Sequence, residues 1–561
     1  MSRGKKEKKI NIYKIFVVII FLCITIFILK IAPNYIRNEI SDKTNLVINN
    51  SNITKRLKND VLVENDVIYI STKDIANFFD EHIFYDNTYD SLITTSNTKV
   101  ATMKLGEKKA KINDVTFSLI AGAKKVDGEF YIPFSEIGKS VYNVETSYKK
   151  ETDTVVIISL DRALTYGNSS KNNNVKYKPT VFSKSVDKVG RGDTLTIVDT
   201  DEEIPSGWKK VTTENGKIGY VKENTIVNIQ KMRDTLKVDK QIEGNVSVVW
   251  DYFSIYGKAP QRTGTIEGVN VVSPTFFALK DGGKGEITAN VGTQGINYIN
   301  WAHSNNYKVW ALVSNDSNKA LTSTILNDYN LRNNLINNIL SVAENYNLDG
   351  INIDFENIKM ADKDVFSRFI IELAPRLRDL GKVLSVDVTA PDGSEDWSLC
   401  YDRNVLGDVA DYIMFMAYDQ HGKSSTEAGT VAGYDWVENS LKKFIDREEV
   451  DSSKIVLGIP FYTRVWTEEN GKLDSFTVEM KETDNYIPEG VEKEWKDDVK
   501  QNYVEYQKNG KTYKIWIEDE ESIKCKLELI QKYNLAGAAY WEKDRESDSI
   551  WKLISEELNI K

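Results

Sequence analysis

Residues 349–356, which read DGINIDFE, hold polar side chains at a spacing that suits acid–base chemistry. In a β-strand alternate side chains share a face, so Asn352, Asp354 and Glu356 would point to one side and the apolar residues between them to the other. Neighbours on that face are about 6.6 Å apart along the strand, because each residue rises by about 3.3 Å. The Asp354 carboxylate is expected to raise the pKa of Glu356, which would suit Glu356 to donate a proton near neutral pH.

The surrounding sequence indicates that this strand is buried on both faces. Helical patterns precede it at 331–347 and follow it at 364–381. Alternating strands and helices predict a parallel sheet that is covered on both sides. A strand at the edge of a sheet, with its acids in water, would show the same alternation, but carboxylates in a buried strand are costly unless partners compensate them. We therefore interpret Asp354 and Glu356 as members of a functional site.

The same alternation extends over residues 245–561 and predicts a (β/α)8 TIM barrel, in which active sites lie at the carboxyl ends of the strands. Residues 463–522 break the alternation and are expected to form a small inserted lobe. The runs expected to be strands are 269–279, 307–314, 350–356, 383–390, 411–418, 454–461 and 537–542, with 286–290 as a candidate for the eighth.

The octet at 349–356 resembles the DxxDxDxE signature of family 18 glycoside hydrolases, the chitinase-like family. Residues 416–419, MAYD, resemble the family's M-x-Y-D strand end, and residues 458–464, GIPFYTR, resemble its seventh strand. Trp541 resembles the tryptophan of the last strand that floors the sugar pocket. Ser273 and Phe277 are similar to the S-x-F pattern of the family's first strand, although their spacing differs.

The resemblance implies hydrolysis of an N-acetylglucosamine-containing glycan by a retaining, substrate-assisted route that uses no metal or other cofactor. Glu356 would protonate the glycosidic oxygen while the substrate's own 2-acetamido group attacks the anomeric carbon to give an oxazolinium intermediate. Asp354 would hold the acetamido N–H, Tyr418 would hydrogen-bond the acetamido carbonyl, and Trp541 would pack under the sugar ring. Further residues expected to contact substrate are Asn352, Asp349, Met416, Asp419, Phe277 and Tyr462.

Two positions of the octet call for separate interpretation. Asn352 stands where many family members have an aspartate, and it is expected to donate a hydrogen bond to Asp354 and so keep Asp354 ionised. This form of the motif, together with the W-x-E-D segment at 516–519, is typical of the family's bacterial spore-cortex and cell-wall N-acetylglucosaminidases. For Asp349 an alternative to substrate contact is that, with Gly350, it shapes the turn into the strand.

Two modules are expected between the N-terminus and the barrel. Residues 50–160 resemble the small α+β module named after the copper amine oxidase N-terminal domain, but one histidine and no cysteine in this segment give no reason to expect copper. Residues 175–230 resemble a small all-β bacterial SH3-like barrel, with a tight hairpin at 214–216, ENG. The polar stretch 167–175 between the two modules is interpreted as a linker.

Residues 1–35 combine a basic start with an uninterrupted apolar run from Ile15 to Leu29. This pattern predicts an uncleaved transmembrane anchor, with the N-terminus in the cytoplasm and the catalytic domain outside. A cleaved signal peptide, followed by secretion, is the alternative, although no small-residue cleavage site follows Leu29. The net charge of −10 argues against a nucleic-acid partner, and the scattered three cysteines and three histidines predict neither a disulfide framework nor a zinc site.

The glycan itself remains open between peptidoglycan and chitin, because both contain N-acetylglucosamine. A wall-binding-like module and a membrane anchor favour peptidoglycan. A non-catalytic glycan-binding protein on the same barrel is the main alternative, and a scaffold for envelope assembly with a vestigial barrel is another. The presence of Glu356 argues against the glycan-binding protein, since family members of that kind usually lack this glutamate. Replacing Glu356 with glutamine would separate an enzyme from both alternatives, because only an enzyme would lose its function.

Overall fold

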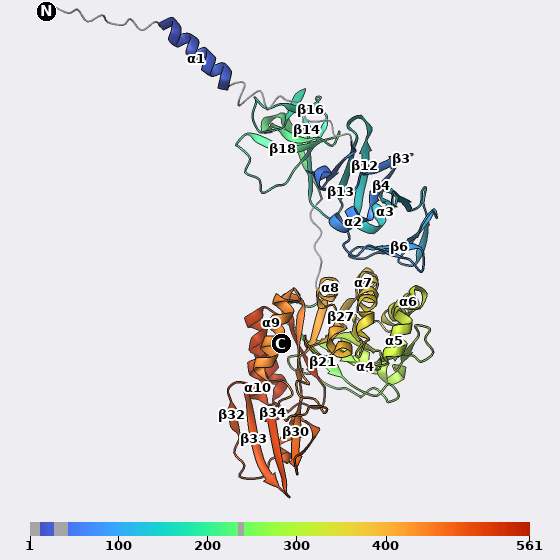
Figure 1. Cartoon of the computed structure of the whole chain (residues 1–561), viewed down its shortest axis with the longest axis vertical. Helices are drawn as coiled ribbons and strands as arrows, with labels where there is room; N and C mark the ends of the chain where they lie inside the picture. Colours follow the sequence, from blue (N-terminus) through green and yellow to red (C-terminus); the bar gives the residue numbers. More distant parts are fainter. Residues whose placement is uncertain (1–11, 27–42, 234–240, 561) are drawn as a thin grey trace, which may run out of the picture. The chain divides into compact units, whose positions relative to one another are not determined.

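The structure is a computed structural model that describes residues 12–26, 43–233 and 241–560 (Figure 1). The described chain divides into two compact units. The first contains the described residues before 234, apart from 97–100, and the second contains residues 97–100 and 241–560. The first unit holds two small modules and the second holds the barrel.

The predicted transmembrane anchor at residues 1–35 lies partly outside the described residues. Its described part includes α1 (Ile12–Ile26), a helix of 15 residues. Among the residues that the structure describes, no helix has both the length and the apolar character needed to cross a membrane.

The first module combines small sheets with two short helices. α2 (Thr72–Phe78) directly follows β4, α3 (Phe134–Tyr142) directly follows β11, and Ile75 and Ile137 from the two helices are buried in one core. The strands are β1 (Asn45–Ile48), β2 (Ser51–Asn52), β3 (Leu62–Glu64), β4 (Val67–Ser71), β5 (Phe84–Asp86), β6 (Ser91–Thr95), β7 (Val100–Lys104), β8 (Lys109–Ile112), β9 (Val115–Ser118), β10 (Lys124–Val126), β11 (Glu129–Pro133), β12 (Val144–Lys149) and β13 (Thr154–Ser159).

The second module is all-β, as predicted, and its strands form one antiparallel sheet in the order β16-β15-β19-β18-β17-β14-β20. The hairpin at 214–216 joins β18 to β19, and Gly216 has the positive φ of 74° that such a turn favours in glycine. The strands are β14 (Leu164–Ser169), β15 (Asn173–Lys176), β16 (Ser185–Val189), β17 (Thr194–Ile197), β18 (Trp208–Thr213), β19 (Ile218–Lys222) and β20 (Ile226–Arg233).

The linker predicted at 167–175 is wrong, because most of these residues belong to the sheet. β14 pairs with both β17 and β20, and β15 pairs with β16. These strands consist largely of polar residues, so they lack the apolar alternation by which strands were predicted. Strand pairing depends on backbone hydrogen bonds, which polar residues form as well as apolar ones. Gly167 fits the packing of the sheet, since a Cβ there would lie 2.5 Å from the Ile226 side chain.

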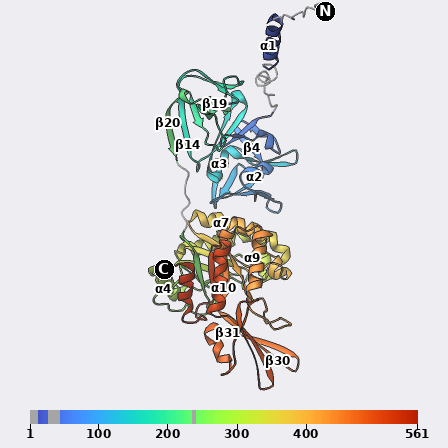
Figure 2. The same cartoon turned by 90° about the vertical axis from the view of Figure 1, so that its left-hand side faces the viewer.

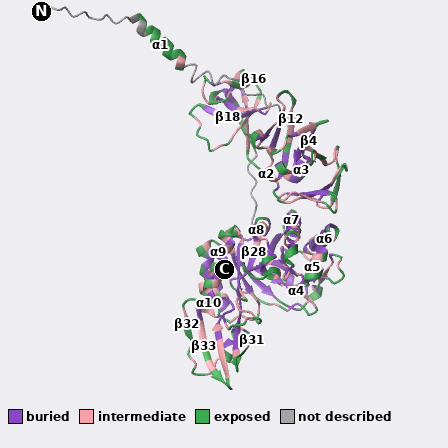
Figure 3. Cartoon of the chain, viewed as in Figure 1, coloured by how far each residue is buried: buried purple, intermediate pink, exposed green. Residues whose placement is uncertain are grey.

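The second unit contains, within residues 241–560, a closed ring of eight parallel strands, which confirms the predicted TIM barrel. Figure 3 shows these strands as the buried centre of the unit. In order around the ring they are β21 (Val246–Asp251), β22 (Val271–Pro274), β25 (Lys308–Ser314), β26 (Gly350–Asp354), β27 (Val383–Thr389), β28 (Tyr412–Met416), β29 (Ile455–Pro460) and β35 (Gly537–Trp541).

The strand candidates at the start of the barrel need correction. The first barrel strand is β21, which the sequence reading missed, and β22 is the second. The predicted strand 269–279 is split into β22 and β23 (Phe277–Leu279), and the candidate eighth strand at 286–290 is β24 (Ile287–Ala289), which pairs antiparallel with β23 outside the ring. No helix separates β21 from β22, so the strand–helix alternation that identified the other strands gives no signal there.

Helices cover the outside of the ring, as Figures 1 and 2 show. α7 illustrates why they lie there: its Phe366, Phe369, Ile370 and Leu373 recur at helical spacing and are all buried. The helices are α4 (Gly292–Ser304), α5 (Lys319–Leu326), α6 (Tyr329–Asn345), α7 (Lys363–Asp379), α8 (Arg403–Val409), α9 (Tyr434–Asp446), α10 (Glu520–Tyr533) and α11 (Ile550–Leu558).

The inserted lobe follows β29 and is an antiparallel sheet in the order β31-β30-β34-β33-β32. It occupies the region predicted at 463–522, and Figure 1 shows it projecting from one end of the barrel. Its strands are β30 (Tyr462–Glu469), β31 (Lys472–Glu479), β32 (Glu494–Lys496), β33 (Gln501–Lys508) and β34 (Lys511–Ile517). Val465, Val504 and Ile515 form its small core.

The W-x-E-D segment joins the lobe to α10 and has a structural task there. The buried carboxylate of Glu518 contacts Lys526 Nζ at 2.9 Å and accepts from Gln501 Nε2 at 2.6 Å. Asp519 is the N-cap of α10, and its side chain accepts from the backbone N–H of Ser522 at 3.0 Å.

Replacing Asp519 with alanine is therefore expected to lower the free energy of unfolding by about 1 kcal/mol, the typical cost of a lost side-chain cap. A urea titration followed by tryptophan fluorescence would measure this change. Asp497→Ala is the control, because Asp497 is exposed and its ion pair with Lys500 lies at the surface, where such pairs contribute little to stability. Equal stability of Asp519→Ala and wild type would contradict the capping role.

Candidate active site

The strand β26 carries its side chains on two faces, as predicted. Asn352 and Asp354 point into the barrel, whereas Ile351, Ile353 and Phe355 belong to the fully buried core under the helices. The ring of Phe355 stacks on Phe369 of α7, with centroids 5.6 Å apart. Packing of this apolar face therefore fixes which way the polar face points.

Glu356 follows the end of β26, and two hydrogen bonds hold its main chain. The Asn315 side chain accepts from the Glu356 N–H at 3.0 Å and donates to the Glu356 carbonyl at 2.8 Å. Tyr401 donates to the carbonyl of the preceding Phe355 at 2.8 Å. The backbone that carries the carboxylate is thus held from two sides before any substrate binds.

Glu356, Asp354 and Trp541 line two adjoining hollows at the mouth of the barrel. One, of about 360 Å³, also contains Asp387, Trp397, Met416, Tyr418, Asp419, Trp436 and Tyr462. The other, of about 330 Å³, extends past Tyr252, Tyr256, Phe277, Asn315 and Asp316. Because Asp354 and Glu356 line both hollows, a glycan bound at these carboxyls could extend into either hollow.

Burial, together with the charges of Asp354 and Asp419, raises the pKa of Glu356 to about 8. Burial, followed by the charge of Asp387, raises the pKa of Asp354 well above its ordinary value. The site therefore holds a carboxyl that is protonated at neutral pH, which is the form needed in a proton donor.

The value for Glu356 predicts how activity depends on pH. A neutral Glu356 can donate a proton and an ionised one cannot, so kcat/KM is expected to fall as the pH rises above about 8. In Asp419→Asn one negative charge near Glu356 is gone, so this alkaline limb should move to lower pH. Initial rates on an aryl glycoside across pH 5 to 10 would measure the alkaline limb in the wild type and in Asp419→Asn. An alkaline limb at the same pH in both proteins would exclude Asp419 as a cause of the raised pKa of Glu356.

Residues at and after the end of β28, together with the first residue of β30, contribute to the lining of the first hollow. Met416 ends β28, and Tyr418 and Asp419 follow it. Tyr462 donates to Asp419 at 2.7 Å, and its ring meets that of Tyr418 edge to face at 6.3 Å. Tyr418 thus lies where a hydroxyl could reach the acetamido group of a sugar held near Asp354.

Trp541 ends β35 and contributes a large aromatic face to both hollows. Its ring contacts Trp250 at 5.9 Å and Tyr252 at 6.1 Å between centroids. These neighbours orient the indole beneath the space next to Glu356, where a pyranose ring could stack on it.

Asn352 does not contact Asp354 as the sequence reading expected. Its Nδ2 donates to Asp387 Oδ1 at 2.6 Å and to Ser385 Oγ at 3.1 Å, both on the neighbouring strand β27. Asp354 Oδ1 is buried without a hydrogen-bond partner among the described residues. The expectation that Asn352 keeps Asp354 ionised is therefore wrong. The pKa of Asp354 is instead raised well above its ordinary value, which favours the neutral acid.

Asp349 lies at the opposite end of β26 from Glu356 and lines neither hollow. Its carboxylate accepts from the Val309 N–H at 3.0 Å and contacts His303 at 2.9 Å and Lys308 at 3.2 Å. These contacts tie the start of β26 to its neighbours, and the predicted substrate contact is wrong. Gly350 is needed beside it, because a Cβ there would lie 2.7 Å from the Trp310 ring.

The two residues of the S-x-F resemblance lie at different depths. Ser273 is fully buried on β22 and donates to Asn352 Oδ1 at 3.3 Å, below the hollows. Phe277 is 1% exposed and lines the second hollow, and its ring packs against Phe276 and Tyr346.

The sequence reading missed several residues of the site. Asp387 could have been found by the rule that selected Asp354, since it is a carboxyl in an otherwise apolar predicted strand. Asn315 directly follows a predicted strand, where the fold places functional residues. Trp397 lies in a short π-helical segment, Glu395–Leu399, and Trp436 lies in the first turn of α9, and nothing local in their sequence connects them to the octet.

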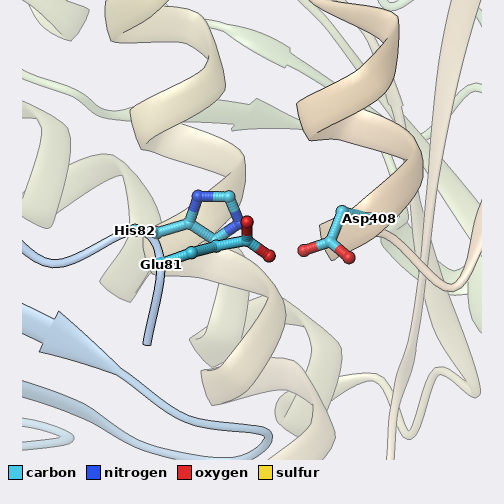
Figure 4. A group of neighbouring side chains, drawn as sticks. All are labelled: Glu81, His82 and Asp408. Carbon is cyan, nitrogen blue, oxygen red and sulfur yellow. The ribbon is translucent and has the colours of Figure 1, made fainter. Parts of the chain in front are cut away.

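No metal site is inferred among the described residues. Figure 4 draws Glu81, His82 and Asp408, a trio of residue types that could bind a cation. Glu81 and His82 belong to the first unit and Asp408 to the second, so they are not counted as one site. Within either unit by itself, the described residues contain no such trio.

Two family models match this chain, one over the barrel and one over the first module. The family model described as glycosyl hydrolases family 18 matches residues 245–546, and the copper amine oxidase N-terminal domain model matches residues 47–157. Both predicted resemblances are thereby confirmed.

Relatives agree with the first match. Uncharacterized glycosylase YvbX of Bacillus subtilis (strain 168) is 27% identical over 299 residues, which cover 51% of this chain and 84% of that protein. The cortical fragment-lytic enzyme of Bacillus anthracis is 22% identical over 367 residues, covering 64% and 77%. A solved chitinase from Chromobacterium violaceum ATCC 12472 aligns at 23% identity and a TM-score of 0.49, covering 56% of this chain and 100% of that one. The glycosyl hydrolase family 18 model matches more than half of the residues of this chain, and the chain therefore belongs to family 18 of the glycosyl hydrolases.

Proposed function

We propose that this glycoside hydrolase is an N-acetylglucosaminidase that cleaves the β-1,4 bond on the reducing side of N-acetylglucosamine in peptidoglycan. The observation that carries the proposal is that Glu356 and Asp354 line one hollow together with Trp541, and the raised pKa of Glu356 supports it. Both carboxyls serve one sugar, and the substrate's acetamido group acts as the nucleophile.

Each side chain has one task in this reaction. Glu356 protonates the leaving oxygen and then, as a carboxylate, takes a proton from the attacking water. Asp354 accepts the acetamido N–H and stabilises the positive charge that develops as the oxazolinium ring forms. Tyr418 donates to the acetamido carbonyl oxygen and orients it toward the anomeric carbon.

The two hollows support cleavage within a glycan chain. Both hollows adjoin Glu356, and beyond the residues that they share each contains further aromatic side chains on which a sugar ring could stack. A site closed on one side would accept only chain ends. We therefore propose endo action.

Peptidoglycan is favoured over chitin by the relatives and by the N-terminal sequence. The relative from Bacillus anthracis is named a cortical fragment-lytic enzyme, and spore cortex is a peptidoglycan. A basic segment followed by an apolar run precedes all folded modules and supports a place outside the cytoplasm, at the cell membrane or secreted.

Product analysis tests the proposal. The purified full-length chain would be incubated with peptidoglycan and, separately, with chitin oligomers, and new reducing ends would be labelled by borohydride reduction and identified by mass spectrometry. Reduced N-acetylglucosamine ends on peptidoglycan fragments are the expected result. Cleavage of chitin oligomers alone would overturn the peptidoglycan assignment, and glycan binding without products from either substrate would favour a glycan-binding protein.

A further inference from the structure

Asp354 has a second carboxyl as its neighbour across the sheet. In the parallel pairing of β26 with β27, Asn352 lies opposite Ser385 and Ile353 opposite Val386, so the next two residues are Asp354 and Asp387. Neighbouring strands are about 4.8 Å apart, and both side chains line the first hollow. The charge of Asp387 contributes to the raised pKa of Asp354, so the two carboxyls do not ionise independently.

Asn352 is fixed in the orientation that serves Asp387. Its Oδ1 accepts from Trp250 Nε1 at 2.9 Å and from Ser273 Oγ at 3.3 Å, so its N–H groups must point the other way. There Nδ2 donates to Asp387 at 2.6 Å. A flipped amide would set its N–H against the indole N–H, so Asn352 cannot turn to another partner at low cost.

The two carboxyls consequently differ in what stabilises their charge. Asp387 accepts a hydrogen bond from Asn352, whereas Asp354 Oδ1 is buried with no partner among the described residues. Hydrogen bonds to a carboxylate favour its ionised form, and burial without them favours the neutral acid. If the pair carries one proton, that proton resides on Asp354 before substrate binds.

We propose that Asp387 exchanges a proton with Asp354 during the reaction and so supplies, from the neighbouring strand, the second carboxyl that Asn352 cannot supply. The inference rests on the proposed function, because it concerns how Asp354 receives the acetamido group. Asp387 is a positioning residue in this scheme, since it acts on substrate only through Asp354.

The proton balance within the pair is simple. Asp354 must become a carboxylate to accept the acetamido N–H and to stabilise the developing oxazolinium charge. Its O–H bond breaks as an O–H bond forms on Asp387, so the proton stays inside the site and the pair keeps its single negative charge. Asn352 can continue to donate to the other oxygen of Asp387. Burial raises the pKa of Asp387 and of Asp354 alike, which agrees with a pair that retains a proton at neutral pH.

Moving the carboxyl from one strand to the other tests the proposal. The variants are Asp387→Asn, Asn352→Asp and the double variant, assayed on an aryl glycoside of di-N-acetylchitobiose across the pH range. Asp387→Asn should lower kcat by about 100-fold, the scale of a disturbed reacting geometry, while KM changes far less. In this variant Asp354 must lose its proton to solvent, so kcat should gain a rise with increasing pH that the wild type lacks.

The double variant distinguishes proton exchange from a packing effect. It restores one carboxyl beside Asp354, and Trp250 and Ser273 can donate to a carboxylate at position 352 just as they donate to the native amide, so kcat should recover at least tenfold over Asp387→Asn. Ser385→Ala is the matched control, because it removes the other hydrogen bond that Asn352 Nδ2 donates and leaves both carboxyls, and it should stay near wild type. Thermal melting of every variant would show that each one folds.

The outcomes separate this inference from the proposed function. Wild-type kcat in Asp387→Asn, or a double variant no better than Asp387→Asn, would overturn the exchange while the enzyme remains an N-acetylglucosaminidase. No turnover of any N-acetylglucosamine substrate by the wild type would instead overturn the proposed function, and the inference with it.

Discussion

Glu356→Gln is expected to lower kcat by about 1,000-fold on any cleaved glycan, within the range that a positioned general acid contributes. Glutamine has nearly the same shape but no acidic proton for the leaving oxygen. Asn315 and Tyr401 hold the backbone of residues 355 and 356 rather than the carboxyl, so the variant should fold normally. Steady-state rates on an aryl glycoside and on peptidoglycan would measure the loss.

Two controls make this result interpretable. Glycan binding should persist in Glu356→Gln, and quenching of tryptophan fluorescence would detect it, since Trp541, Trp397 and Trp436 line the first hollow. Glu344→Gln, at an exposed position on α6, should leave the rates unchanged. A Glu356→Gln variant with wild-type kcat would show that another group donates the proton, and Glu356 would lose its assigned role.

Asp354→Asn is expected to lower kcat by about 100-fold, a loss typical of one charge-stabilising group in a preorganised site. The amide can still accept a hydrogen bond from the acetamido N–H, but it carries no charge to balance the oxazolinium. KM should change less than kcat, because the missing interaction strengthens only as that charge develops. Steady-state kinetics on N-acetylglucosamine oligomers would separate the two constants.

The same variant should not lose stability. Asp354 is a buried carboxyl whose Oδ1 lacks a partner among the described residues, so the native side chain costs folding free energy that asparagine avoids in part. We expect the melting temperature to stay equal or rise. A variant that is both inactive and clearly less stable would show that Asp354 supports the fold, and its loss of activity would then say nothing of the chemistry.

The octet shows what local sequence can establish about a site. The period of two in a strand is a property of backbone geometry, so the shared face of Asn352, Asp354 and Glu356 could be derived from the octet alone. The identity of their partners could not. Asn352 was expected to serve Asp354 along its own strand, yet it contacts Asp387 across the sheet, because strand register joins residues far apart in the chain.

The barrel shows the same division. Strands that alternate with helices were predictable, because the spacing of apolar residues differs between a strand and a helix and can be recognised in the sequence. β21 was not, because no helix follows it, and the strand is recognised only by its parallel pairing with β22 and β35. Asp349 illustrates the consequence for function: it belongs to the sequence motif, but its place at the far end of the strand gives it a structural task.

By itself the sequence determined the fold family, the shared strand face of Asp354 and Glu356, and the tryptophan proposed to lie beneath the sugar, because these depend on local periodicity and on motifs within single segments. Only the tertiary structure decided which carboxyl neighbours Asp354, which side chain holds the backbone of Glu356, and which side chains line the two hollows. Those features arise where strands from distant parts of the chain meet, and contacts of that kind leave no mark in the spacing of residues along one strand.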